Sequence, residues 1–144
     1  MNFLTLFVTI SGYIIGLGAV TVIDMLGFLG RKSPYWTEAT TRAHKVTKPL
    51  IWIGMVMAFG GGLFYYSENY PEWLVGHAGI FMVLILNGLF LSFYVSPYLL
   101  KQEKEGNASK LLPDRLQYAI TGSFIISFIG WWSSFVLLVY SITT

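Results

Sequence analysis

The sequence contains no cysteine and has very few charged residues, nine Lys and Arg and seven Asp and Glu among 144. The lack of cysteine excludes disulfides, thiolate metal ligands and cysteine nucleophiles. Ordinary soluble domains carry roughly 25% charged residues, whereas this chain has 11%. A net charge of +2 is too small to favour nucleic acid as a partner. The composition therefore excludes a soluble enzyme, a disordered chain and a nucleic-acid-binding module.

Long apolar runs, which account for most of the 55% hydrophobic residues, indicate a membrane protein. A helix needs about 20 mostly apolar residues to cross the hydrocarbon core. The runs do not alternate as barrel strands do. We therefore predict an all-α polytopic membrane protein, a single domain over residues 1–144 folded as an antiparallel bundle of four transmembrane helices. The predicted spans lie near residues 3–29, 49–67, 75–99 and 117–141.

The cations are confined to two of the three connecting loops. All nine Lys and Arg residues lie in residues 30–48 and 101–115. Because cytoplasmic loops carry an excess of Lys and Arg, we expect both of these loops to be cytoplasmic and both termini to lie outside. The rule fits a bacterial inner (plasma) membrane most directly. Within the first loop, Ser33 and Pro34 predict the start of a short interfacial helix over about 34–47.

Small residues recur along each predicted span and are expected to let the helices approach closely. Two adjacent tryptophans, Trp131 and Trp132, lie in the middle of the fourth span. Either one packs inside the bundle while the other meets lipid or a partner, or both form the wall of a cofactor site. The candidate packing residues are Gly12, Gly16, Gly54, Ala58, Gly62 and Gly88.

Two polar side chains fall inside predicted spans. Asp24 lies toward the cytoplasmic end of the first span, where a carboxylate is costly and marks a functional candidate. It either pairs with Lys48 or Arg115 or serves as a proton or ligand site. Asn87 lies near the middle of the third span and is expected to hydrogen-bond between helices.

The two histidines, His44 and His77, are the candidate haem ligands. His44 precedes the second span and His77 opens the third, so they should lie about 30 Å apart across the membrane. They therefore cannot clamp one haem together, although either can serve as a single axial ligand of a b-type haem. Each is alternatively a hydrogen-bonded surface group near the membrane interface. No metal-binding motif occurs in the sequence.

Several apolar runs carry a family resemblance, namely GYIIGLGAVTVIDMLGFL, HKVTKPLIWIGMVMAFGGGLF, ILNGLFLSFYVSPYL and SFIISFIGWWSSF. On these runs the chain resembles small, mostly uncharacterised bacterial four-helix membrane proteins. It is distantly similar to the copper-resistance-D-like and J-type protoporphyrinogen-oxidase-like group. The resemblance implies a helical membrane bundle and an association with haem. The better-known relatives place a histidine in the first span, where this chain has Ser11-Gly12-Tyr13.

Three functions are consistent with these features. Short loops and few polar groups favour a non-enzymatic accessory or interaction subunit, for example of a bioenergetic complex. Such a subunit binds a membrane-protein partner or forms a homo-oligomer. The histidines and the resemblance favour a haem-binding or redox protein. Asp24 and Asn87 favour a small proton-linked transporter, although no broken helix or inverted repeat supports a midplane site.

Overall fold

The computed structural model describes residues 3–67 and 70–143, which are almost entirely helical. Helix α3 (Leu74–Phe90), the π-helical turn η1 (Leu91–Val95) and helix α4 (Ser96–Lys104) follow one another without a break. The described residues therefore form four long helical units. Each unit is long and apolar enough to cross a membrane, which confirms that part of the prediction. The described residues contain no strand. The elements are α1 Phe3–Gly30, α2 Pro34–Tyr66, α3 Leu74–Phe90, η1 Leu91–Val95, α4 Ser96–Lys104 and α5 Asp114–Thr143.

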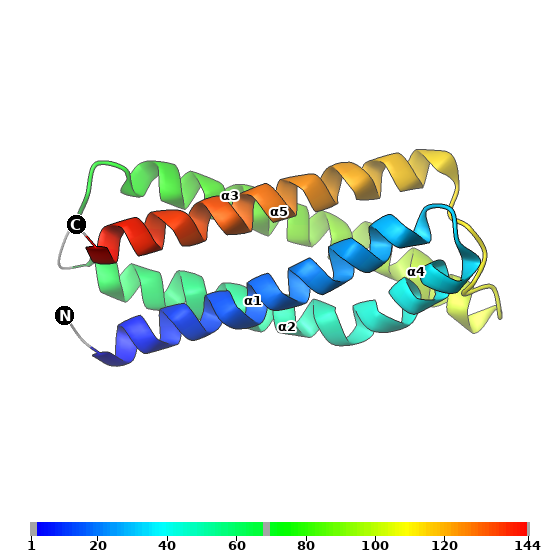
Figure 1. Cartoon of the computed structure of the whole chain (residues 1–144), viewed down its shortest axis with the longest axis horizontal. Coiled ribbons are helices and arrows are strands. Elements are labelled where there is room, and N and C mark those ends of the chain that lie inside the picture. Colours follow the sequence, from blue (N-terminus) through cyan, green and yellow to red (C-terminus); the bar gives the residue numbers. More distant parts are fainter. Residues whose placement is uncertain (1–2, 68–69, 144) are drawn as a thin grey trace.

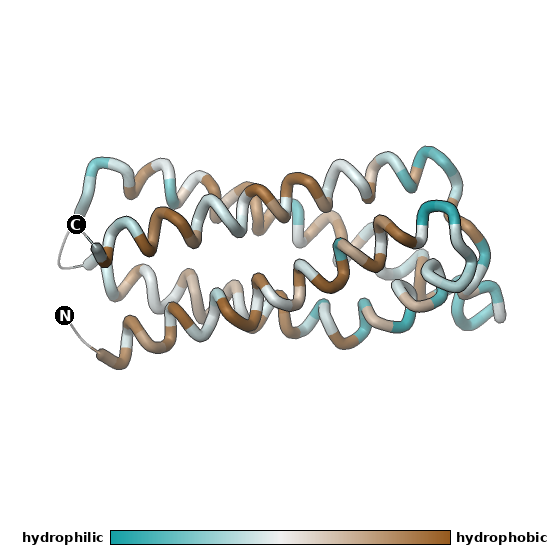
Figure 2. The backbone as a smooth tube through the Cα atoms, viewed as in Figure 1, coloured by the Kyte–Doolittle hydropathy of each residue, from teal (hydrophilic) through white to brown (hydrophobic). Residues whose placement is uncertain are grey.

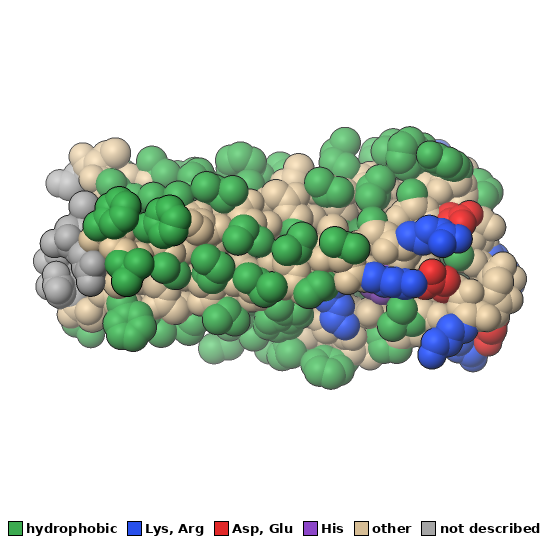
Figure 3. Space-filling model, turned by 90° about the horizontal axis from the view of Figure 1, so that it is seen from below, with side chains coloured by type: hydrophobic (Ala, Val, Ile, Leu, Met, Phe, Trp, Pro, Cys, Tyr) green, Lys and Arg blue, Asp and Glu red, His purple; other side chains and the backbone are tan. Residues whose placement is uncertain are grey.

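The four units lie along one long axis and alternate in direction, so that the start of α1 and the end of α5 lie at the same end of the molecule (Figure 1). Apolar residues dominate the middle of the molecule, and the most hydrophilic backbone lies around the loops of the opposite end (Figure 2). Lys, Arg, Asp and Glu side chains gather at that opposite end in the view of Figure 3. We call it the charged end, and the other the terminal end.

Helix α2 begins where the sequence predicts a helix start. Ser33 is extended and its hydroxyl accepts a hydrogen bond from the Trp36 N–H at 3.5 Å, with Pro34 in the first helical turn. Glu38 and Arg42 form an ion pair at 2.7 Å, one helical turn apart. The segment predicted as a separate interfacial helix is continuous with the second span. The helix continues past Pro49, because neighbouring helices can compensate for the backbone hydrogen bond that a proline removes.

Helices α1 and α2 pack backbone against backbone. A Cβ added to Gly54 would lie 2.5 Å from the Gly16 Cα, and one added to Gly12 would collide with the Ala58 backbone. Ala58 itself is buried. Because only residues as small as glycine and alanine leave room for such contact, these four residues let the backbones of α1 and α2 approach closely.

Of the other two predicted packing glycines, Gly88 lies against a side chain of another helix and Gly62 does not. A Cβ on Gly88 would lie 3.3 Å from the Trp52 ring, so Gly88 accommodates that indole. A Cβ on Gly62 would meet only Tyr66, at 4.0 Å, whereas its neighbour Gly61 is the residue that contacts Thr9 of α1. Adjacent glycines point in different directions on a helix, and the sequence pattern alone could not choose between them.

The bundle centre is filled by Trp131. Its ring is 1% exposed and lies against Gly16, which has no side chain to obstruct it, whereas Trp132 is 42% exposed on the outside. Leu84 of α3 fills the space beside Gly130. The adjacent tryptophans thus take different environments, one inside the bundle and one on its surface.

The π-helical turn η1 ends immediately before α4. Pro97 has no N–H to donate to the carbonyl four residues earlier, and its ring crowds that carbonyl. The Ser96 N–H instead donates to the Leu91 carbonyl, five residues back. The proline therefore accounts for the widened turn, and such turns are often found at functional sites.

The glycine contact between α1 and α2 can be tested with two alanine substitutions. We expect Gly54→Ala to lower the free energy of unfolding by about 1–3 kcal/mol, because its methyl group must push the two backbones apart. Gly60→Ala is the matched control on the same helix, where a Cβ meets nothing within 4 Å. It should be neutral or stabilise by up to about 1 kcal/mol through helix propensity. Unfolding in mild detergent followed by circular dichroism measures both; equal effects would contradict the packing.

Candidate functional site

Polar side chains meet inside the bundle at two levels. Near the terminal end, Tyr13, His77 and Ser134 come together from α1, α3 and α5. Near the charged end, His44 and Lys48 line a groove between α2 and the α3–η1–α4 unit. The two predicted histidines therefore belong to separate sites and do not face a common ligand.

The terminal-end cluster is a closed set of hydrogen bonds. The His77 Nε2 atom lies 2.6 Å from the Ser134 Oγ and 3.1 Å from the Tyr13 hydroxyl. The Tyr13 and Ser134 hydroxyls also contact each other. All three side chains are buried. Hydrogen bonds between buried polar groups offset their desolvation, so the cluster joins three helices at one point.

Aromatic rings enclose His77 on its other sides. The centroids of Tyr66, Trp73 and Phe81 lie 5.3–5.8 Å from the imidazole centroid. The adjoining cavity has a volume of about 40 Å³. Ligand sites for molecules of drug size occupy several hundred Å³, and Nε2 is already hydrogen-bonded. The residues around His77 therefore do not fit a haem.

At the charged end, His44 is held by its own helix. Its Nδ1 donates to the Thr41 carbonyl one turn earlier, which leaves Nε2 without a hydrogen-bond partner among the described residues. The groove beside it has a volume of about 80 Å³, again far below the size of a haem. Among the described residues, His, Cys, Asp and Glu form no group of three or more that could bind a metal.

Side chains of α2 bond across this groove to the opposite wall. The Trp52 Nε1–H donates to the Ser92 hydroxyl at 3.0 Å, and the Lys48 ammonium lies 3.4 Å from the Ser96 hydroxyl. Beyond Lys48 toward the charged end, Lys45 and Glu103 form an ion pair at 2.6 Å that joins α2 to α4. The groove is thus bridged by polar contacts.

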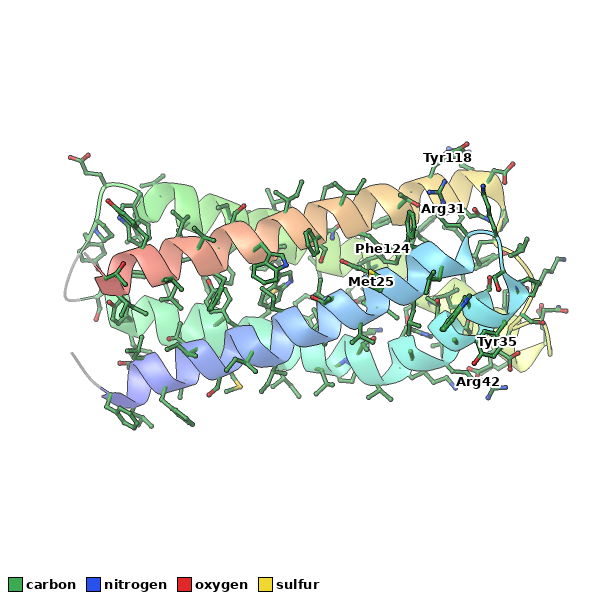
Figure 4. All side chains as sticks on the ribbon, viewed as in Figure 1. Met25, Arg31, Tyr35, Arg42, Tyr118 and Phe124 are labelled. Atoms are coloured by element: carbon green, nitrogen blue, oxygen red, sulfur yellow. The ribbon has the colours of Figure 1, made fainter. Side chains whose placement is uncertain are left out.

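Asp24 lies away from this groove, on the part of α1 that faces α5. One turn further on, Gly27 contacts the ring of Phe124, and Phe124 is seen at the level of Met25 in Figure 4. The Asp24 Oδ2 atom is buried and has no hydrogen-bond partner in the part of the chain that the structure describes. The expected pair with Lys48 or Arg115 is absent from the ion pairs of the described residues, because Lys48 is directed toward α4 instead.

Asn87 links α3 to α5, in the manner expected from the sequence. Its side-chain amide donates to the Ser123 carbonyl at 3.0 Å and accepts from the Ser123 hydroxyl at 2.6 Å. An amide with both ends satisfied in this way acts as a link between helices.

Two residues of the terminal-end cluster, Tyr13 and Ser134, could not be predicted as site residues from the sequence. Tyr13 resembles an ordinary apolar aromatic in its span, and Ser134 resembles a small packing residue. The hydroxyls of both became informative only when the fold placed them beside His77. The groove could have been found from a sequence pattern. Lys48 and Ser96 each directly precede a proline, Pro49 and Pro97, so both helices carry a polar residue beside an irregular point.

The terminal-end cluster predicts unequal effects for two neighbouring serines. Ser134→Ala should destabilise the protein by about 1–3 kcal/mol, because it removes the central partner of two buried groups. Ser133→Ala, outside the cluster, should change stability by less than about 0.5 kcal/mol. Detergent unfolding measured by near-ultraviolet circular dichroism compares them. A Ser133 effect as large as that of Ser134 would contradict the role of the cluster.

The unpartnered carboxyl predicts a second difference. Asp24→Asn should leave the unfolding free energy unchanged or raise it by about 1 kcal/mol, because a neutral amide is less costly to bury than a carboxylate lacking a partner. Asp114→Asn, in the first turn of α5, is the control and should cost about 0.3–1 kcal/mol. Chemical denaturation of both variants measures the difference. A large destabilisation by Asp24→Asn would show that the charged form has a stabilising partner.

With this geometry established, the chain was compared with known proteins. It matches no protein-family model, no curated protein and no solved structure. The resemblance to the copper-resistance-D-like and J-type protoporphyrinogen-oxidase-like group remains a prediction from sequence. What the structure establishes is an all-helical chain with four helices long and apolar enough to span a membrane.

Proposed function

We propose that this protein is a small accessory subunit that binds a larger membrane protein through the outward face of α3. In this proposal the chain is an antiparallel transmembrane bundle in a bacterial inner membrane. Loops 30–48 and 101–115 face the cytoplasm, and both termini lie outside. The confinement of every Lys and Arg to those two loops supports this orientation.

The observation that carries the proposal is the weak burial of α3. Only three of its 17 residues, His77, Phe81 and Leu84, are buried within the bundle. Its opposite face exposes Gly76 and Gly79, and a Cβ added to either would meet nothing within 4 Å. The bundle itself therefore leaves these two glycines unused.

Exposed glycines favour a protein partner over lipid. Between membrane helices there is no hydrophobic driving force, and close packing of small residues supplies much of the attraction. Gly76, Gly79 and Val83 recur at helical spacing on one face, and Val83 is 50% exposed. This face allows another helix to approach closely, as Gly12 and Gly54 do between α1 and α2.

The interior supports an interaction role rather than catalysis. Trp131 fills the centre, the cluster around His77 is closed by its own hydrogen bonds, and the cavity beside it is small. A substrate pocket of the usual size would need several hundred Å³. The outward surfaces are therefore the part of the molecule with most capacity to bind another molecule.

Site-specific cross-linking tests this face. A photo-cross-linking amino acid at Val83, introduced in the native membrane, should give one adduct with a different membrane protein, identified by mass spectrometry. The same amino acid at Ile14 of α1, which is 67% exposed, is the matched control and should give lipid adducts only.

Three results would count against the proposal. Adducts at both positions in equal yield would show non-specific contact, and an adduct between two copies of the chain would indicate a homo-oligomer. Recovery of the uncross-linked chain as a free monomer in mild detergent, with no adduct at Val83, would remove the partner altogether.

A further inference from the structure

The groove at the charged end has an apolar floor and a polar rim. Ile23, Ile51, Leu91 and Phe124, contributed by α1, α2, η1 and α5, line it inside. The polar side chains of its α2 wall belong to the part of that helix nearest the charged end. This arrangement places apolar surface inside the bundle and polar groups toward the membrane boundary, the order found in an amphipathic lipid.

Both walls of the groove carry a proline in the same region. Pro49 interrupts the hydrogen-bond ladder of α2, and Pro97 accompanies the π-helical turn in the opposite wall. Both features remove regular backbone hydrogen bonds from the helices on which they lie. The groove thus lies where both of its walls depart from a regular α-helix, and it is separate from the outward face of α3.

Lys48 is the cation left over when the charges around the groove are paired. On α2, Arg42 pairs with Glu38 at 2.7 Å and Lys45 pairs with Glu103 at 2.6 Å. Lys48 forms no ion pair among the described residues, and its one hydrogen bond is the 3.4 Å contact with Ser96. A half-buried ammonium without a counter-charge favours an anionic ligand.

Lys48 lies at the depth expected for the phosphates of the lipid headgroups. It is the last charged residue before the apolar stretch that starts at Pro49, so its ammonium lies at the boundary where headgroups lie. His44, one turn nearer the charged end, also lines the groove. Its Nδ1 carries the hydrogen bonded to the Thr41 carbonyl, so the neutral ring presents Nε2 as an acceptor for a headgroup hydroxyl.

From these observations we propose that the groove is a binding site for one anionic glycerophospholipid. Its phosphate contacts Lys48, its headgroup hydroxyl donates to His44, and only the start of one acyl chain lies along Ile51 and Phe124. The groove volume of about 80 Å³ holds this part of the molecule, and the rest of the lipid lies outside the groove on the apolar surface of the bundle. Charge complementarity selects the headgroup, because the neighbouring carboxylates of Glu38 and Glu103 are already neutralised.

Native mass spectrometry of the full chain in mild detergent tests the site. The chain is loaded with phosphatidylglycerol or with phosphatidylcholine of the same acyl chains, and the retained lipid is counted. We expect one phosphatidylglycerol to be retained with about five- to tenfold preference. Lys48→Gln should abolish the preference, Lys48→Arg should keep it, and Lys101→Gln, an exposed cation that faces Glu105 at 3.9 Å, is the matched control.

Each outcome decides the proposal. Equal retention of the two lipids by the unsubstituted protein would overturn it without the need for any variant. An unchanged preference for phosphatidylglycerol in Lys48→Gln would also overturn it. So would a loss of that preference in Lys101→Gln as large as the loss in Lys48→Gln. Inorganic phosphate alone, if it displaced the retained lipid at millimolar concentration, would show a site for a free anion and would also overturn the lipid assignment.

Discussion

The close approach of α1 and α2 is the contact on which the rest of the structure depends. Where Gly12 and Gly16 meet Gly54 and Ala58, two backbones touch with no side chain between them. In a membrane, where lipid competes equally for apolar side chains, such contact is a main source of attraction between helices. Gly16 also leaves room for Trp131, so the position of α5 follows from the same glycine.

Filling the centre with Trp131 separates the interior into two polar regions. Toward the terminal end, the His77 Nε2 atom is hydrogen-bonded to Tyr13 and Ser134, which makes His77 a structural link between α1, α3 and α5. Toward the charged end, Lys48 faces a groove and has no carboxylate partner among residues 3–67 and 70–143. The two histidines thus differ in what they can bind, although the sequence presents them as equivalent candidates.

Much of the fold could be predicted from the sequence because one physical requirement governs it. A span must be apolar over about 20 residues, so the scarcity of charge alone marks the four helices. The packing glycines follow from a similar rule, and Gly12, Gly16 and Gly54 make the contacts expected of them. Gly61, in place of Gly62, shows the limit of that rule, because helix rotation depends on the neighbouring helix.

By itself the sequence determined which segments are helical, where the cations gather and that Asp24 would be a costly intramembrane group. Tertiary structure alone decided which polar groups meet. His77, Tyr13 and Ser134 are far apart in the chain, and so are Lys48 and Ser96. Contacts over such separations depend on the rotation and path of each helix relative to its neighbours. Those quantities arise from packing between helices, which a local pattern does not encode.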